Sequence, residues 1–207
     1  MKNTIVMIVF ILFYSYQEKA IAQAFKKGDF DLGLGAGIGG YYKTYSNPGV
    51  SSSQIPFIGI TGETCAFDKI GPGSIGIGGY LGFKSLTETG TYEKTNLGHK
   101  FIYTYKQIYR YYIIGAKAAF HYSPKTVQKL DLYGGLMIHY NIRTYNETSD
   151  DPTFNATSYH GKTGGSYAST SEFIGAKYFF KPKLGAFIEF GIGISNATIG
   201  LTYKISK

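Results

Sequence analysis

Apolar residues alternate with glycine or charged residues along much of this chain. In residues 29–42, Phe30, Leu32 and Leu34 share one parity, while Asp31 and Gly33 share the other. A period of two places successive side chains on opposite faces of a β-strand. The pattern therefore predicts a strand with one apolar face and one face of glycine and charge.

The same alternation recurs in eight segments of the sequence. They span residues 29–42, 54–67, 74–84, 107–122, 131–143, 167–180, 184–195 and 197–205. Strands in soluble proteins most often have about 5–6 residues, whereas a tilted strand needs about 9–11 to cross a bilayer. The lengths of these segments favour membrane-crossing strands.

Short and long connections alternate between these segments. The short connections are residues 68–73, 123–130 and 181–183. The long polar connections are residues 43–53, 85–106 and 144–166. The last connection, Ser195-Asn196, is short where a long one would be expected. Such asymmetry is typical of outer-membrane barrels, and closure into a ring removes exposed sheet edges. We predict an all-β fold, an eight-stranded antiparallel up-and-down transmembrane β-barrel. A secreted soluble barrel is the alternative, but a core filled with glycine would bury too little volume.

The first 22 residues have the features of a secretory signal peptide. Lys2 precedes an uncharged apolar run at residues 5–14, and Ala20-Ile21-Ala22 is a small-residue cleavage site. A transmembrane anchor is the alternative, but the run is shorter than the roughly 20 residues that a spanning helix needs. We expect cleavage after Ala22, an outer-membrane β-barrel domain over residues 23–207, and location in the cell outer membrane.

The amino-acid composition excludes several other classes of protein. The chain has 28 Gly, 20 Tyr, 15 Phe, one Cys and no Trp, and 16% of its residues are charged. Glycine at this level disfavours a helical bundle, and the aromatic content disfavours a disordered chain. The lone Cys65 excludes a disulfide framework, and no Cys/His spacing suggests zinc. The net charge of +8 comes from scattered lysines without a basic stripe, so we predict no nucleic-acid partner.

Charged residues on the glycine face predict an interior network. Counting from the short-turn end places Glu63, Lys117, Lys177 and Glu189 at similar heights, with Asp31 and Lys204 as candidates for the same layer. Buried charges are tolerated when they are paired. We predict that these six residues form a salt-bridge and hydrogen-bond network inside the barrel; separate charges in a watery lumen are the alternative.

The chain resembles the small eight-stranded outer-membrane barrels, such as outer-membrane protein X and the barrel domain of outer-membrane protein A. The closing residues 187–193 and 199–204 are similar to the terminal hairpin of Bacteroidota-type outer-membrane β-barrel domains. The resemblance implies a closed barrel without a wide pore, and insertion by the outer-membrane assembly machinery. Members usually end in an aromatic residue, whereas this chain ends Ile205-Ser206-Lys207.

The sequence contains only weak matches to known catalytic motifs. Gly35-x-Gly37-x-x-Gly40 matches a dinucleotide fingerprint, but no helix follows it. Some small outer-membrane barrels modify lipids with His and Ser; here His99 and His160 fall in predicted loops, His121 near the short-turn end and His139 in the lumen, without triad spacing. We predict no catalytic, cofactor or metal-binding residues.

These observations favour a non-enzymatic, monomeric barrel that presents long loops for adhesion or interaction. A narrow pore or conduit for small hydrophobic solutes is the alternative, and a lipid A-modifying enzyme is a third hypothesis. The expected partners are outer-membrane lipid and the assembly machinery. Loop cations such as Lys43, Lys94, Lys100, Lys106 and Lys162 either bridge lipopolysaccharide phosphates or are simply solvated.

Overall fold

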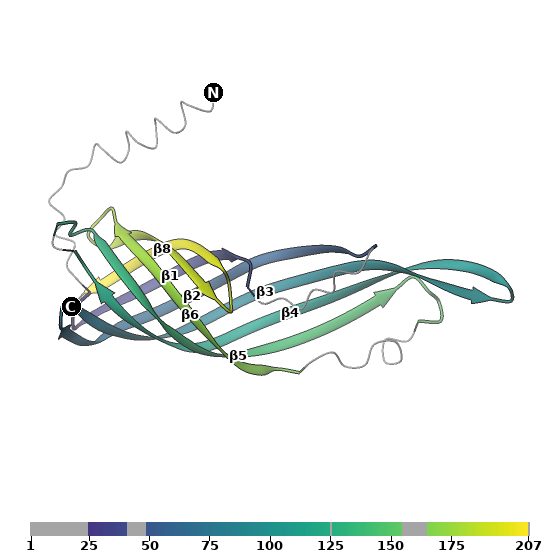
Figure 1. Cartoon of the computed structure of the whole chain (residues 1–207), viewed down its shortest axis with the longest axis horizontal. Helices are drawn as coiled ribbons and strands as arrows, with labels where there is room; N and C mark the ends of the chain where they lie inside the picture. The colour runs from purple at the N-terminus through teal and green to yellow at the C-terminus, as the bar shows by residue number, and fades with distance from the viewer. Residues whose placement is uncertain (1–24, 41–48, 125, 155–164, 207) are drawn as a thin grey trace, which may run out of the picture.

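The alternating segments pair edge to edge into a closed ring (Figure 1). The computed structural model describes residues 25–40, 49–124, 126–154 and 165–206; the expected signal peptide, Lys43, His160 and Lys162 lie outside them. The strands of this described part are β1 (Asp29–Ile38), β2 (Ser51–Ile70), β3 (Gly73–Asn96), β4 (His99–Tyr122), β5 (Leu130–Ser149), β6 (Tyr167–Phe179), β7 (Leu184–Ile192) and β8 (Ala197–Ser206). Each pairs antiparallel with the next, and β8 pairs with β1. The predicted eight-stranded barrel is confirmed.

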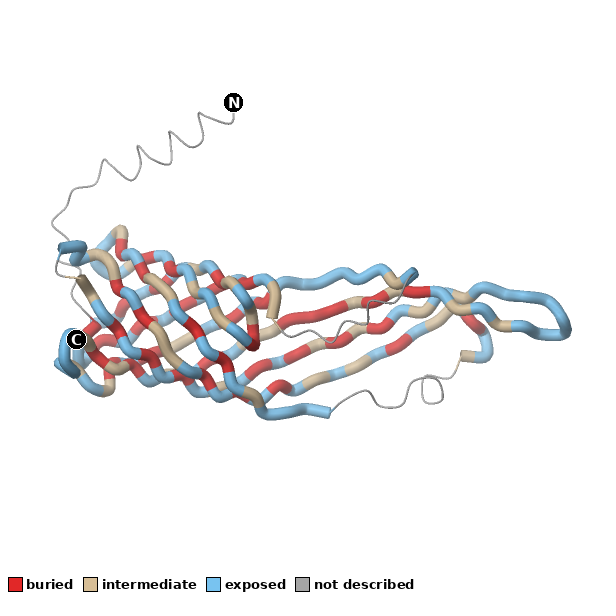
Figure 2. The backbone as a smooth tube through the Cα atoms, in the orientation of Figure 1, coloured by how far each residue is buried: buried red, intermediate tan, exposed pale blue. Residues whose placement is uncertain are grey.

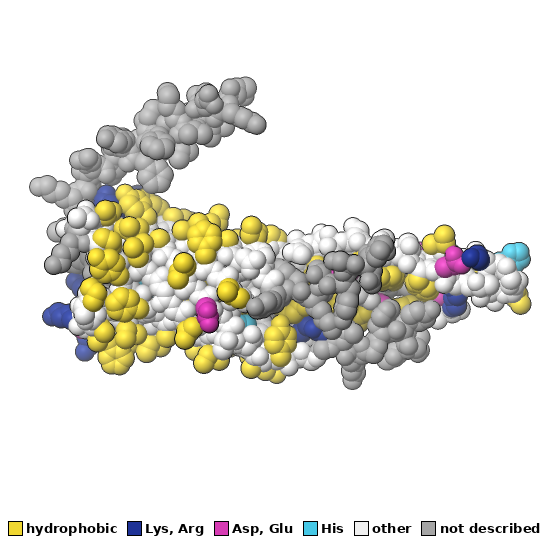
Figure 3. Space-filling model, viewed as in Figure 1, with side chains coloured by type: hydrophobic (Ala, Val, Ile, Leu, Met, Phe, Trp, Pro, Cys, Tyr) yellow, Lys and Arg dark blue, Asp and Glu magenta, His cyan; other side chains and the backbone are white. Residues whose placement is uncertain are grey.

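The two faces of each strand differ as the alternation requires (Figure 2). On β1, Asp31 points into the ring and is 2% exposed, whereas Leu34 points outward and is 56% exposed. Large apolar side chains cover much of the outside of the ring (Figure 3). Water would not tolerate so continuous an apolar surface, whereas the hydrocarbon of a bilayer removes it from water. The ring is therefore a transmembrane barrel whose outside faces lipid.

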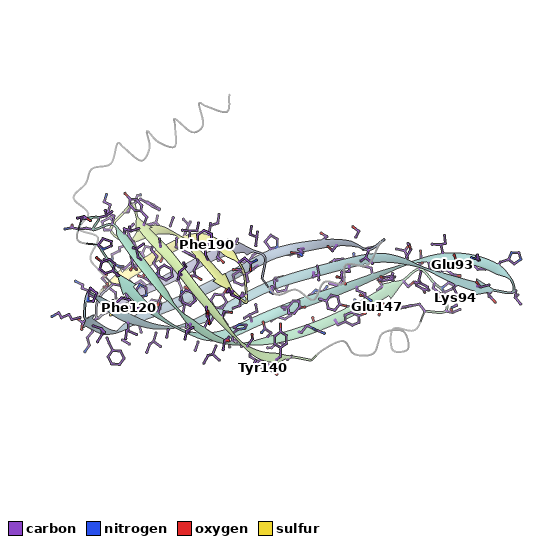
Figure 4. The ribbon with its side chains drawn as sticks, viewed as in Figure 1. Glu93, Lys94, Phe120, Tyr140, Glu147 and Phe190 are labelled. Carbon is purple, nitrogen blue, oxygen red and sulfur yellow. The ribbon has the colours of Figure 1, made fainter. Side chains whose placement is uncertain are left out.

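The aromatic side chains of the ring follow the same rule. Phe120, Phe190 and Tyr140 project outward from the ring (Figure 4). Tyr109 and Tyr111, which share a parity with Lys117 on β4, point inward and are buried.

Among the described residues, no helix has the length and the apolar composition that a membrane-crossing helix needs.

One acidic side chain interrupts the apolar outer surface. Glu172 on β6 is exposed, and its strand neighbours are Leu136 on β5 and Ile192 on β7, both of which are exposed as well. Ile174, two residues further along β6, is also exposed. Glu172 thus places a carboxylate among lipid-facing side chains.

The largest departure from the sequence prediction is the expected loop at residues 85–106, which is strand. The register of β3 and β4 continues without a shift from Ser74↔His121 to Asn96↔His99, and the hairpin extends far beyond the ring (Figure 1). Leu97 and Gly98 close it with positive φ angles of 49° and 80°, as a two-residue type I′ turn requires. Beyond the bilayer, polar residues occupy the ribbon, so the alternation fades while Thr and Tyr keep their strand preference. Likewise β5 runs to Ser149, beyond its predicted end at residue 143.

Candidate functional site

The lumen at the short-turn end of the barrel is filled by charged side chains. Lys177 on β6 places its Nζ 2.9 Å from Asp31 Oδ2 on β1 and 3.5 Å from Glu63 Oε2 on β2. All three side chains are almost fully buried. The ring closure makes this contact possible, because β1 and β6 are far apart in sequence and lie across the lumen from each other.

His121 on β4 extends this cluster. Its Nε2 lies 2.9 Å from Glu63 Oε1, and its Nδ1 lies 2.9 Å from Asp131 Oδ2 on β5. A carboxylate oxygen accepts a hydrogen bond, so this geometry suits an imidazolium that donates from both nitrogens. The sequence placed His121 near the short-turn end, where the structure has it, but gave it no partner; its side chain is buried between two carboxylates.

A second level lies further along the lumen. Lys117 Nζ is 3.2 Å from Glu189 Oε2, and the Tyr133 hydroxyl donates to the same oxygen at 2.9 Å. The ammonium also lies 4.3 Å from the Phe173 ring centroid. Cation–π contact of this kind stabilises a desolvated lysine.

Lys204 makes a separate contact at the end of the barrel. Its Nζ is 3.7 Å from Asp29 Oδ2 and 4.5 Å from the Phe179 ring centroid. The six residues predicted from sequence therefore all point inward, and their ion pairs form three groups. Lys177 joins Asp31 and Glu63, Lys117 joins Glu189, and Lys204 joins Asp29.

A polar cluster toward the long-loop end brings together a serine, a histidine and an asparagine. His139 Nε2 lies 3.0 Å from Ser171 Oγ, and Asn141 Nδ2 lies 3.0 Å from His139 Nδ1. With the amide donating to Nδ1, Nε2 carries the hydrogen and donates to the serine. A nucleophilic serine needs the opposite polarity, in which it donates to the imidazole. The cavity beside Ser171 is about 20 Å³, which suits one water. This arrangement favours structural hydrogen bonding over acyl transfer.

Comparisons with known proteins find similar solved structures only. No family model matches the chain, and no curated protein matches it. OprG of Pseudomonas aeruginosa, an outer membrane protein, is 14% identical, with 90% of this chain and 100% of that chain covered and a TM-score of 0.47. The N-terminal β-barrel domain of OprF from the same species is 12% identical, with 86% and 98% covered and a TM-score of 0.43.

A third similar structure is Ail, the attachment invasion locus protein of Yersinia pestis, in complex with the heparin analogue sucrose octasulfate. It is 12% identical, with 87% of this chain and 100% of that chain covered and a TM-score of 0.39. Similarity at this level supports no transfer of ligand or activity. The barrel architecture of the present chain rests on its own strand pairing.

Sequence reasoning missed four members of the lumenal network, namely Asp29, His121, Asp131 and Tyr133. Each has the parity of the lumenal face of its strand, so its inward direction could be predicted from the sequence. The residues that it contacts could not be predicted in this way, because they depend on the register between strands. His121 and Glu63, for example, lie on β4 and β2, which are separated by β3.

Proposed function

We propose that this chain is a non-enzymatic outer-membrane barrel whose main working part is the β3–β4 hairpin, held outside the cell for adhesion or interaction. The observation that carries the proposal is the unbroken pairing of β3 with β4 from inside the ring to Asn96↔His99. A hairpin this long has no role in closing the barrel. In barrels of this class the long connections are extracellular and the short turns periplasmic.

The hairpin is braced from its side. Asp151, just after β5, accepts hydrogen bonds from Lys94 Nζ at 2.9 Å and from the Tyr92 hydroxyl at 3.0 Å. Asp150 Oδ1 accepts from the backbone N–H of Thr104 at 2.7 Å. Bracing reduces the conformational entropy that binding would otherwise cost. The hairpin is thus suited to present a preorganised surface.

The tip of the hairpin carries exposed side chains of mixed chemistry. Leu97 is 93% exposed, and Ile102 is also highly exposed. Lys100 and Glu93 form a surface ion pair at 2.7 Å (Figure 4 shows Glu93 at this end). Exposed apolar residues framed by charge are typical of recognition surfaces.

The filled lumen supports this proposal over a pore or solute conduit. The groups around Lys177 and Lys117 hold buried ion pairs across the ring interior, where an open pathway would need space. A stable single-channel conductance in planar bilayers would overturn this part. A change in lipid A mass on expression of the protein would favour the lipid-modifying alternative.

The remaining expectations stay part of this proposal. Cleavage of the signal peptide after Ala22, insertion by the assembly machinery, and kinship with outer-membrane protein X or the Bacteroidota-type barrels are predictions from sequence. Contact with lipopolysaccharide phosphates through Lys94 and Lys100 is weakened as a hypothesis, because Asp151 and Glu93 pair with these lysines. Lys106 remains an exposed candidate.

Presentation outside the cell is tested with an epitope tag inserted between Leu97 and Gly98. Antibody should bind intact cells that express the tagged protein. A tag between Gly71 and Pro72, in the β2–β3 turn, is the matched control and should bind only after the outer membrane is permeabilised. The reverse pattern would overturn the proposed orientation.

Adhesion is tested by shortening the hairpin. Replacing residues 92–103 with Asn-Gly joins Thr91 to Thr104, which are already cross-strand partners. The shortened protein should keep the heat-dependent gel shift of a folded barrel, while cells that express it lose retention on a surface coated with extracellular matrix. Equal retention of both cell types, above that of cells without the protein, would refute a role for the hairpin tip.

A further inference from the structure

Phe25, four residues before β1, enters the lumen at its short-turn end. Asp29 N donates to Lys26 O at 3.0 Å, which closes a four-residue turn, and Lys26 N donates back to Asp29 Oδ2 at 3.2 Å. Gly28 sits at the third position of this turn with φ +96°, a conformation that glycine adopts without strain. The turn reverses the chain direction, so Phe25 points into the barrel and is 2% exposed.

The side chain of Phe25 occupies a socket whose walls come from β2, β3, β4 and β6. Its ring centroid lies 4.3 Å from that of His121, and Lys177 Nζ lies 5.6 Å from its centroid. A Cβ added to Gly76 would stand 2.9 Å from Phe25 Cε1, so only glycine at 76 leaves room for the ring. Contact with two cationic groups suits the negative face of an aromatic ring.

The backbone of Phe25 is held as well. Ser74 Oγ donates to Phe25 O at 2.6 Å, and Cys65 Sγ lies 3.9 Å from the same oxygen. Cys65 is buried beneath this contact. Both the ring and the carbonyl of Phe25 therefore have dedicated partners inside the barrel.

A cavity of about 490 Å³ lies at the short-turn mouth, lined by the β2–β3 turn, Lys26, Ser74 and Ser123, and also by Phe25 and His121. The Phe25 ring thus stands between this mouth cavity and the ion pairs of Lys177 with Asp31 and Glu63. Ion pairs are stronger where water is excluded. A plug at this position would keep the Lys177 ion pairs dry from the short-turn side.

We infer that the short-turn end of the lumen is a binding site for one aromatic side chain, and that Phe25 fills it as an intramolecular plug. The plug closes the barrel on the side opposite the hairpin, independently of what the hairpin binds. Phe30, the next aromatic residue along the chain, points in the opposite direction: it faces outward and contributes to the lipid-facing surface.

The native cysteine reports directly on this plug, because the sequence has no other cysteine. The experiment measures the rate at which a small, water-soluble methanethiosulfonate reagent modifies Cys65 in the folded, full-length protein in detergent. Phe25→Ala should raise that rate about tenfold or more, because burial of one phenylalanine side chain shifts an equilibrium by at least this factor. Phe30→Ala is the matched control and should leave the rate unchanged.

Gly76→Ala provides a second test that leaves Phe25 itself in place. The added methyl group would crowd the ring and the Glu63 carboxylate, so the Cys65 rate should rise here too. The heat-dependent gel shift establishes that each variant is folded. If Phe25→Ala does not fold, Phe25→Leu is compared instead and should give a rate above that of wild type. Wild-type rates in the folded Phe25 and Gly76 variants would overturn the inference, as would a folded wild type that reacts as fast as the unfolded chain.

Discussion

Removal of the Lys177 ammonium is the sharpest test of the lumenal network. Lys177 contacts two carboxylates, Asp31 at 2.9 Å and Glu63 at 3.5 Å, and its side chain is 6% exposed. At 2.9 Å and an effective dielectric constant near 20, the attraction to Asp31 alone is roughly 6 kcal/mol, against a desolvation cost of several kcal/mol for each ion. Lys177→Met leaves both carboxylates buried without this partner. We expect a loss of about 3–5 kcal/mol in the free energy of unfolding.

The measurement is equilibrium urea unfolding in lipid vesicles, followed by the heat-dependent gel shift and circular dichroism, since the chain has no Trp to report by fluorescence. Lys100→Met is the matched control, because Lys100 also pairs with a glutamate, at 2.7 Å, but both side chains are more than half exposed. Surface pairs contribute about 0–1 kcal/mol, so this variant should change little.

A double variant tests whether the pairing itself is responsible. Lys177→Met with Asp31→Asn removes one charge of each sign and leaves Glu63 with His121. It should recover about half of the loss or more, because coupled residues in one network deviate from additivity by about 0.5–3 kcal/mol. If Lys177→Met costs no more than Lys100→Met, or if the two single losses simply add, the network is not held by paired charges.

Three further predictions concern other parts of the molecule. His121→Gln should cost about 2–4 kcal/mol in the same unfolding assay, because Gln cannot supply a charged donor to two buried carboxylates at once; an unchanged midpoint would contradict the bridging role of His121. Glu172→Leu should stabilise the barrel in vesicles by about 1 kcal/mol, because it removes a carboxylate from the lipid-facing surface; a loss of stability would indicate that Glu172 has a cationic partner. Burial opposes ionisation of Asp151, but hydrogen bonds from Lys94 and Thr153 outweigh it and hold the pKa of Asp151 well below its ordinary value of 3.8. The brace should therefore contribute fully above pH 3.8 and be lost as the pH falls through the lower folded value; carboxyl NMR titration checks this, and Asp151→Asn should abolish that acid-side transition.

The interior direction of the six network residues was accessible from the sequence because a strand has a strict period of two. Glu63 shares its parity with Gly59, and Lys177 shares its parity with Gly175, while the outward neighbours of both are apolar or small. A bilayer on one side and a narrow lumen on the other impose opposite chemistry on the two parities. Strand number and the existence of a closed ring followed from the same constraint.

The extent of the projecting hairpin was not accessible in this way. In water, the ribbon of β3 and β4 beyond the ring needs no apolar face, so its Thr- and Tyr-rich sequence looked like a loop. Its strand structure is decided by cross-strand pairs such as Tyr92↔Tyr103 and by the brace at Asp151. Neither contact leaves a local pattern in the sequence.

The strands, and the face of each strand on which a side chain lies, follow from the local order of residues, because lipid on one side of the sheet enforces that choice. Which charges meet is a property of the folded ring. Partners inside a tilted ring depend on the accumulated register of every intervening strand pair, so Lys177 meets Asp31, His121 joins Glu63 to Asp131, and Lys204 meets Asp29. The position of Phe25 was also decided there, since its socket is assembled from strands that only ring closure brings together.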